Sequence, residues 1–402
     1  MHHNLISEQN QTVTPEKLSI FANFFSEFKI GSLLNKSGIS KTKGAAPLAV
    51  FTIVFNLAFT GKNFFQGIVK DKKITIGKDA VYNFLNSPSY NWRRFTLLLS
   101  TKIYLLIRHL LDDCSEEVLI FDDSLYDRNR SKKVELLSRV FDHNTKKYLK
   151  GFRMLTLGWS DGNSFLGLDF SLLSSAKQGN RYNGITKDLD KRTCGYQRRK
   201  EAMTKSTELM EPMFKRALAM GVRAKYLLMD SWFSAPSIIS KLRSHIHIIC
   251  MLKDHPNWLY EYRGKKLRLR DLYGKLKKKP GRAKIKASVL VKLPDGQDAR
   301  IIFVPSDKKR GWLARYNLLA LFQRQQVDQR SFGDLFRFCN EEMENIKFID
   351  ALKVIMQMAM AAIHKSKSVS EKIVQTIMNA VMGAAIIFFG LDNNELSLMP
   401  EA

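Results

Sequence analysis

Two short apolar segments of the sequence each end in aspartate. Residues 118–121 are followed by Asp122 and Asp123, and residues 224–229 are followed by Asp230. Apolar runs of this length are typical of buried strands, so we expect both acids at strand ends, in neighbouring strands of one sheet. Carboxylates gathered in this way hold the divalent metals of enzymes that attack phosphodiesters, where two metals lie roughly 4 Å apart. We interpret Asp123 and Asp230 as the candidate catalytic and metal-binding residues, with Mg²⁺, which prefers oxygen ligands, as the expected ion.

Each of these residues also has a plainer interpretation. An aspartate at a strand end is a common cap, so neither Asp123 nor Asp230 alone would predict catalysis, although the two together in a basic chain do. Asp122 is either a second carboxylate that orients the site or a cap. Trp232 and Phe233 directly follow Asp230. They could stack on a frayed base, but packing in the core is the favoured interpretation.

The charge of the chain indicates a phosphate-rich partner. Lys and Arg number 65 against 38 Asp and Glu, which gives a formal net charge of +27. A field of this sign attracts nucleic acid or an anionic membrane surface. The 26 Phe and 12 Tyr are spread through sequence that reads as globular, which favours nucleic acid over a short basic membrane anchor.

Cysteine usage and apolar patterning predict a cytoplasmic, membrane-free protein. The polar N-terminus lacks an apolar signal core. Residues 373–391 are apolar but contain Gln375 and Asn379, so we expect a buried or interfacial helix rather than a membrane span. The isolated cysteines have neither disulfide-framework nor zinc-site spacing and fit a reducing compartment. They are Cys114, Cys194, Cys250 and Cys339.

A short segment in the N-terminal part has the pattern of a DNA-recognition helix. Residues 75–86 predict a turn and a helix that would carry Lys78 and Asn83 outward, with Val81, Phe84 and Leu85 inward. An ordinary packed helix explains the pattern equally well.

Other basic residues are candidates for DNA contact through the phosphate backbone. Some follow the predicted recognition helix, some lie on a helix before the second aspartate, and some form a dense loop further on. A solvated basic surface is the alternative, and it is nearly as good for the middle group. The candidates are Arg93, Arg94, Arg198, Arg199, Lys200, Lys277, Lys278, Lys279 and Arg282.

The pattern of elements predicts an α/β fold. Three consecutive strands, the last two joined at Asp161 and Gly162, are followed by helix, strand, helix and strand. This order matches an RNase H-like mixed sheet flanked by helices. The expected strands are 118–121, 152–159, 164–170, 224–230 and 245–252, and the expected helices are 196–220, ending at Gly221, and 235–244.

We expect the chain to divide into four parts. Residues 1–112 read as a helical DNA-binding domain and residues 113–257 as the RNase H-like catalytic core. Residues 258–306 alternate as strands and carry a cationic face, which predicts a basic β-rich insertion. Residues 307–402 read as C-terminal helices.

Four segments together resemble the DDE transposases of bacterial insertion sequences, specifically the insertion-sequence-four family. The segments are 121–126 (FDDSLY), 150–159 (KGFRMLTLGW), 191–200 (KRTCGYQRRK) and 229–234 (MDSWFS). The resemblance runs from about residue 15 to about residue 365. It places the first two catalytic acids on Asp123 and Asp230.

The resemblance also implies an activity and its partners. It implies cut-and-paste DNA transposition by metal-dependent cleavage and strand transfer, with Mg²⁺ as cofactor and Mn²⁺ tolerated. The implied partners are double-stranded DNA, the inverted-repeat ends of a transposon, and a second copy of the chain when bound to DNA. The implied location is the bacterial cytoplasm, with the nucleoid.

The third catalytic acid of the family has no counterpart in this sequence. The family carries it as a Glu on a helix after the insertion, whereas here Tyr316 is followed by Gln323 at that spacing. We infer that a segment has been lost near Ala314 and Arg315. Glu341 and Glu342 lie on a different predicted helix, and even a 1 Å misplacement of a catalytic group is costly, so substitution by them is disfavoured.

Two functions therefore stay open. The chain is either a transposase impaired by an internal deletion or an inactive DNA-binding competitor and repressor of intact copies. A nuclease without strand transfer and a membrane-associated basic protein are weaker alternatives.

Overall fold

Strand β1 (Val118–Asp127) is the central strand of the larger sheet. Its first four residues are fully buried because they are covered on both faces, as expected for a continuous apolar run. The computed structural model describes residues 22–60, 70, 75–111, 116–143, 145–162, 164–186, 188–281, 285–304 and 317–319.

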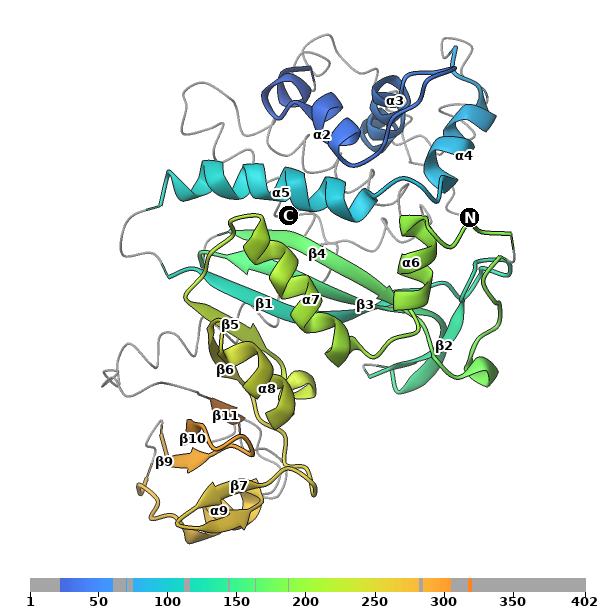
Figure 1. Ribbon diagram of the computed structural model, residues 1–402. Coiled ribbons are helices and arrows are strands. Elements are labelled where there is room, and N and C mark those ends of the chain that lie inside the picture. Colours follow the sequence, from blue (N-terminus) through green and yellow to red (C-terminus); the bar gives the residue numbers. More distant parts are fainter. Residues whose placement is uncertain are drawn as a thin grey trace, which may run out of the picture. The chain divides into compact units, whose positions relative to one another are not determined.

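The larger sheet has the strand order of an RNase H-like fold. Strand β1 pairs antiparallel with β3 (Lys147–Ser160) and parallel with β5 (Tyr226–Met229). Strand β4 (Phe165–Leu173) extends the sheet beyond β3, and β6 (His247–Cys250) extends it beyond β5. The order β4-β3-β1-β5-β6, antiparallel on one side and parallel on the other, confirms the predicted mixed sheet (Figure 1).

Two of the described helices pack on this sheet. Helix α7 (Ser206–Ala219) contacts β3 and β4 and buries Met210, Met213 and Phe214 at helical spacing. Helix α8 (Pro236–Arg243) contacts β6 and α7, and it begins with proline in its first turn. The apolar faces of both helices therefore form the core together with the sheet (Figure 1).

The predicted single helix over residues 196–220 is wrong. The structure has α6 (Cys194–Glu201) and α7, separated by a turn in which the Ala202 carbonyl accepts a hydrogen bond from the Ser174 N–H. This tertiary bond competes with continuation of the helix. The predicted end at Gly221 is confirmed, because that glycine has φ of 86°, the left-handed conformation that ends helices.

Strand β1 is longer than predicted. It continues through both aspartates to Asp127, because its residues keep pairing with β3 as far as Gly151. The expectation that the strand ends before Asp123 is therefore wrong. Pairing with β5 does stop at Phe121, so Asp122 and Asp123 lie just past the end of that neighbour.

The hairpin predicted at Asp161 and Gly162 is confirmed. Gly162 has φ of 89°, and the Asp161 carboxylate accepts a hydrogen bond from the Ser164 N–H at 2.7 Å. A further strand was not predicted. It is β2 (Ser138–Asp142), which pairs antiparallel with the first residues of β3.

The N-terminal unit contains the described residues up to Leu110 together with Leu189–Gln197. Its helices pack through a cluster of aromatic rings that includes Phe24, Phe51, Phe55 and Phe95. Among the described residues this part is helical, as predicted. The helices are α2 (Ile30–Lys36), α3 (Pro47–Thr60), α4 (Lys78–Asn86) and α5 (Trp92–Arg108).

The second sheet has the order β11-β10-β9-β7-β8 and confirms a β-rich segment after residue 258. The helix α9 (Leu269–Lys275), whose Leu269 and Leu272 are buried at helical spacing, was not predicted within this β-rich segment. The strands are β7 (Tyr260–Tyr262), β8 (Lys265–Leu267), β9 (Ala287–Lys292), β10 (Asp298–Val304) and β11 (Asn317–Leu319).

Several expectations fall on residues that the structure does not describe. The predicted C-terminal helices, the apolar stretch 373–391 and the inferred junction near Ala314 and Arg315 lie outside the described residues, as do Glu341 and Glu342. The division of the chain at residues 112, 257 and 306 stays a prediction. Within the described part, no helix combines the length and apolar character needed to cross a bilayer.

Candidate active site

Three acidic residues follow the point at which β1 and β5 stop pairing. Phe121 and Met229 are the last paired residues of β1 and β5, and Asp122 and Asp230 come next on their strands. The charge of Asp230 raises the pKa values of both Asp122 and Asp123, as expected for carboxylates gathered at one place. The pairing of β1 with β5 therefore places Asp123 and Asp230 near each other, while their roles as catalytic and metal-binding residues stay a prediction.

Asp123 is held by an arginine from the neighbouring strand. The Nε of Arg153 lies 2.8 Å from Asp123 Oδ2, and its Nη2 donates to Oδ1 at 3.3 Å. Asp123 is paired across the strands with Leu155, so Arg153 is its diagonal neighbour on the same face. Burial raises the pKa of Asp123, while the charge and hydrogen bond of Arg153 act in the opposite direction.

Asp122 has the more perturbed carboxyl group. Burial, with contributions from the charges of Asp123 and Asp230, raises its pKa to about 7, although a hydrogen bond to backbone acts against the shift. A carboxyl group with this pKa exists in both protonation states near neutral pH. The negative charges of Asp123 and Asp230 thus favour the neutral form of Asp122, and its role in orienting the site stays a prediction.

Asp230 is fixed by the turn that it begins. It precedes a short 3₁₀ helix, η3 (Ser231–Phe233), and its Oδ1 accepts a hydrogen bond from the Ser231 N–H at 2.5 Å. Ser234 Oγ donates to the Ser231 carbonyl at 2.8 Å and closes the turn. Because Phe233 is fully buried, it anchors this turn to the core.

Trp232 does not follow the expectation of core packing. Its side chain is 51% exposed, whereas the neighbouring Phe233 is buried. The 3₁₀ turn explains the difference, since consecutive residues in such a turn point in different directions. The indole, two residues after Asp230 in the chain, therefore has much of its surface in solvent.

The donor set fits a divalent cation. Two carboxylates that repel each other lie at one sheet edge, and Mg²⁺ is often bound through only one or two carboxylates while it keeps several waters. Asp123 and Asp230 are the residues that would hold it. Among the residues that the structure describes, no group of three or more His, Cys, Asp or Glu side chains is arranged to ligate a metal.

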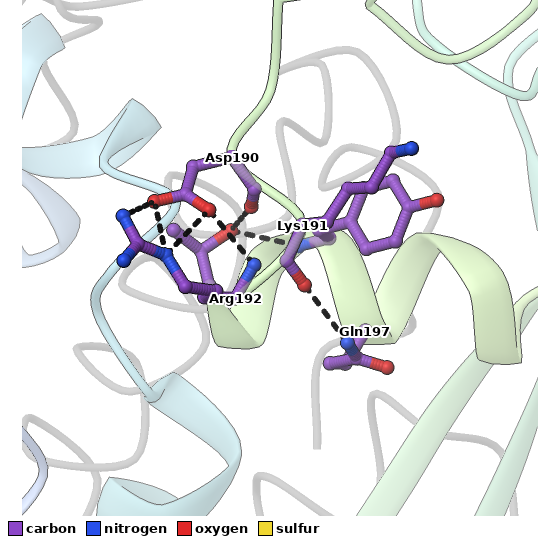
Figure 2. Close-up of polar contacts among 6 residues, drawn as sticks. Asp190, Lys191, Arg192 and Gln197 are labelled. Atoms are coloured by element: carbon purple, nitrogen blue, oxygen red, sulfur yellow. Dashed lines mark hydrogen bonds and ion pairs between the residues drawn. The ribbon is translucent and has the colours of Figure 1, made fainter.

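The basic motif at 191–200 begins with a hydrogen-bonded loop that belongs to the N-terminal unit (Figure 2). The Asp190 carboxylate accepts from the Arg192 N–H at 2.9 Å, from its Nε at 3.2 Å and from its Nη2 at 3.0 Å. Gln197 Nε2 donates to the Lys191 carbonyl at 2.9 Å. Figure 2 shows Arg192 turned back against Asp190, so the acid partly neutralises this guanidinium.

A close backbone contact with Pro88 explains why this motif has a glycine at position 195. Its N–H donates to the Pro88 carbonyl at 2.8 Å, and a Cβ at this position would lie 2.8 Å from Pro88 Cα. The start of α6 thus approaches the loop after α4 more closely than any side chain would allow.

The three cations of α6 that were predicted to contact DNA have different surroundings. Arg199 forms an ion pair with Glu135, which also accepts hydrogen bonds from Thr186. Burial would raise the pKa of Glu135, but the hydrogen bonds from Thr186 and Arg199 lower it. Arg198 is half-buried and Lys200 is exposed. Lys200 is thus the most accessible of the three.

The remaining predicted DNA contacts lie on two other segments. Arg93 and Arg94 are in the first turn of α5, where Arg94 is exposed. Lys277, Lys278 and Lys279 are exposed in the loop after α9. Arg282 lies outside the described residues.

The geometry of the predicted recognition helix is as expected. In α4, Lys78 and Asn83 are exposed and Val81 and Phe84 are buried, whereas Leu85 is only half-buried. Its contact with DNA stays a prediction.

Sequence reasoning missed Arg153 and His143. Arg153 is a charged residue within the otherwise apolar residues 152–159, and this exception to the pattern was the available signal. Burial raises the pKa of Asp123, and the charge of His143 opposes this rise less strongly than Arg153 does. No local signal marks His143, because it reaches the site only through the fold.

Comparison with known proteins places this geometry in context. A family model described as DDE superfamily endonuclease matches residues 57–264, slightly more than half of the chain. No curated protein sequence matches. Among solved structures, the chain is similar to the Drosophila P element transposase strand transfer complex, with 10% identity and a TM-score of 0.20. The match covers 64% of this chain and 55% of that chain.

Proposed function

The chain belongs to the DDE superfamily of endonucleases, and from this membership we propose that it is a DNA transposase of the insertion-sequence-four type. The observation that carries the proposal is the gathering of Asp122, Asp123 and Asp230 where β1 and β5 stop pairing. The proposed reaction is cut-and-paste transposition, in which phosphodiester cleavage at the transposon ends is followed by strand transfer.

The residues of the site have distinct roles in this proposal. Asp123 and Asp230 would hold Mg²⁺, with Mn²⁺ tolerated. When bound, such cations supply charge stabilisation for the attacking and leaving oxygens of the phosphodiester. Arg153 orients the Asp123 carboxylate and favours its charged form. Asp122, with a pKa of about 7, holds or releases a proton beside the site near neutral pH.

Double-stranded DNA is the proposed partner, bound at the inverted-repeat ends of a transposon by two copies of the chain. The formal net charge of +27 supports an electrostatic contribution to binding. The proposed contacts are made by the α4 and α5 segments, by α6, and by Lys277, Lys278 and Lys279. The exposed cations among them are available to phosphates.

A second function is favoured by the carboxylate count. Within the described residues, only Asp123 and Asp230 are proposed as metal ligands, and no group of three possible ligands is found. The sequence also lacks the family's Glu at the expected spacing. The alternative is therefore a DNA-binding competitor that occupies transposon ends and represses intact copies without cleaving them.

Cleavage of a labelled transposon end in Mg²⁺ or Mn²⁺ separates these functions. The transposase proposal expects nicked or cut ends that disappear in Asp123→Ala and persist in the control Asp271→Ala, which alters an exposed acid of α9. The competitor alternative expects specific end binding, equal in all three proteins, with no cleavage. Absence of both binding and cleavage would contradict the two functions together.

A further inference from the structure

A continuous series of aromatic rings and cations leads away from Asp230. We call the six residues Arg139, Phe141, His143, Tyr148, Trp232 and Lys253 the aromatic track. All of them belong to the unit that contains the RNase H-like sheet.

Contacts between neighbours define the track. At its inner end Lys253 Nζ lies 5.0 Å from the centre of the Trp232 ring, and the His143 ring lies 6.1 Å from Trp232. His143 and Phe141 are 5.1 Å apart, as are Phe141 and Tyr148.

The outer end is closed by another cation, since the guanidinium of Arg139 lies 3.9 Å from the centre of the Tyr148 ring. The track therefore begins beside Asp230 and ends on the β2–β3 pair, with a cation stacked on an aromatic ring at each end.

The alternation of strand β2 turns this series toward solvent. Ser138, Val140 and Asp142 are buried, whereas Arg139 is exposed and Phe141 is half-buried. Phe141 is paired directly with Tyr148 on β3, so both rings lie on the same outward face.

Exposure of the largest rings needs an explanation. Tyr148 is 59% exposed and Trp232 is 51% exposed, although large aromatic side chains are usually covered in a folded protein. Exposed aromatic rings interleaved with cations are the arrangement by which proteins hold single strands, because unpaired bases stack on the rings while phosphates contact the cations.

We propose that the aromatic track binds a single strand of DNA and leads it to the carboxylates at Asp123 and Asp230. Charge complementarity favours a nucleic-acid strand over a peptide, because the track has a cation at each end, Arg139 and Lys253. An intact duplex cannot offer its base faces to the rings. The strand is therefore one that has been frayed or freed near the cleavage site. This inference rests on the proposed function, because it assigns the track to the same substrate.

Fluorescence anisotropy with a labelled single strand of about 15 nucleotides, the upper end of single-domain site sizes, tests the proposal without metal, in EDTA. Tyr148→Ala and Trp232→Ala should each bind the single strand roughly 5- to 150-fold more weakly, as expected for loss of one base stack. Trp232→Phe, which keeps an aromatic ring at this position, should retain most of the affinity for the single strand. Leu290→Ala, which truncates an exposed apolar side chain of β9, should bind as the unaltered protein does.

A second measurement tests the proposal even if the alanine variants fold poorly. An unlabelled single strand should quench the fluorescence of exposed Trp232 in the unaltered protein, and this component should be missing in Trp232→Phe. Binding by Tyr148→Ala and Trp232→Ala equal to that of Leu290→Ala would overturn the proposal, as would a failure of the unaltered protein to bind single strands.

Failure of the track and failure of the proposed function are distinguishable. The double variant with Asp123→Asn and Asp230→Asn lacks the proposed metal ligands but keeps the track, so in EDTA it should bind the single strand at least as tightly as the unaltered protein. If the protein cleaves DNA but Tyr148→Ala and Trp232→Ala bind the single strand as tightly as the unaltered protein does, only the proposal for the aromatic track is overturned. Single-strand binding that depends on the track, with no cleavage, supports the track and counts against the transposase.

Discussion

Arg153 holds Asp123 at two points, with Nε 2.8 Å from Oδ2 and Nη2 3.3 Å from Oδ1, across the antiparallel pairing of β3 with β1. The side chains are 24% and 13% exposed, so the pair is largely shielded from water. This ion pair keeps a carboxylate available in a place where burial favours the neutral acid.

Removal of the arginine should destabilise the fold. Arg153→Gln leaves a mostly buried carboxylate without its charged partner, which we expect to cost roughly 2–3 kcal/mol in the free energy of unfolding. Lys215→Gln is the matched control, because it breaks an exposed ion pair with Glu211 that is worth less than about 1 kcal/mol. Urea unfolding measures both. Equal losses in the two variants would count against the proposed importance of the shielded pair.

Asp122 should make stability depend on pH. Its pKa is about 7 in the folded protein against an ordinary value of 3.8, so the unfolded state releases this proton first as pH rises. The free energy of unfolding should therefore fall between about pH 4 and pH 7.

Asp122→Asn should remove part of this fall and be more stable than the unaltered protein at pH 8. The gain should be a few kcal/mol, since one unit of pKa shift corresponds to about 1.4 kcal/mol. Urea unfolding in EDTA at pH 5 and pH 8 is the measurement. The same pH dependence in both proteins would show that the Asp122 carboxyl is not held in the neutral form.

The close approach of α6 to Pro88 predicts an intolerant glycine. Gly195→Ala places a Cβ 2.8 Å from backbone atoms of Pro88, and the resulting shift should cost roughly 1–3 kcal/mol. Gly184→Ala is the control, because nothing lies within 4 Å of a Cβ there. Thermal unfolding compares the two variants, and an unchanged midpoint for Gly195→Ala would contradict the contact.

The exposed lysines after α9 should contribute to DNA affinity through phosphates. Replacing Lys277, Lys278 and Lys279 by Gln should reduce the slope of log affinity against log salt by about 3, since each phosphate contact contributes about 1. Lys215→Gln should leave the slope unchanged. Filter binding of duplex DNA over a range of salt concentrations checks this. An unaltered slope in the triple variant would show that these lysines do not contact phosphates.

Much of the sheet could be predicted because each strand carries its own signal. The apolar runs before Asp122 and Asp230 indicated buried strands that end near acids, and Asp161 with Gly162 indicated the hairpin. These are local patterns, and the parallel pairing of β1 with β5 brings their acids together as expected.

The rest depends on contacts between distant residues. Residues 122–127 look too polar for a strand, and they are extended only because β3 pairs with them. Arg153 and Asp123 are separated by 30 positions, so no local pattern joins them. The exposure of Trp232 likewise depends on the turn that Asp230 begins, and that turn is anchored by the burial of Phe233.

The central claim is that Asp123 and Asp230 together bind a divalent cation. Calorimetric titration of Mn²⁺ into the unaltered protein, Asp123→Asn, Asp230→Asn and the control Asp271→Asn tests it most directly. We predict binding that weakens about tenfold or more in each of the first two variants, a loss of at least about 1.4 kcal/mol, and is unchanged in the control. Equal Mn²⁺ affinity in all four proteins would contradict the site.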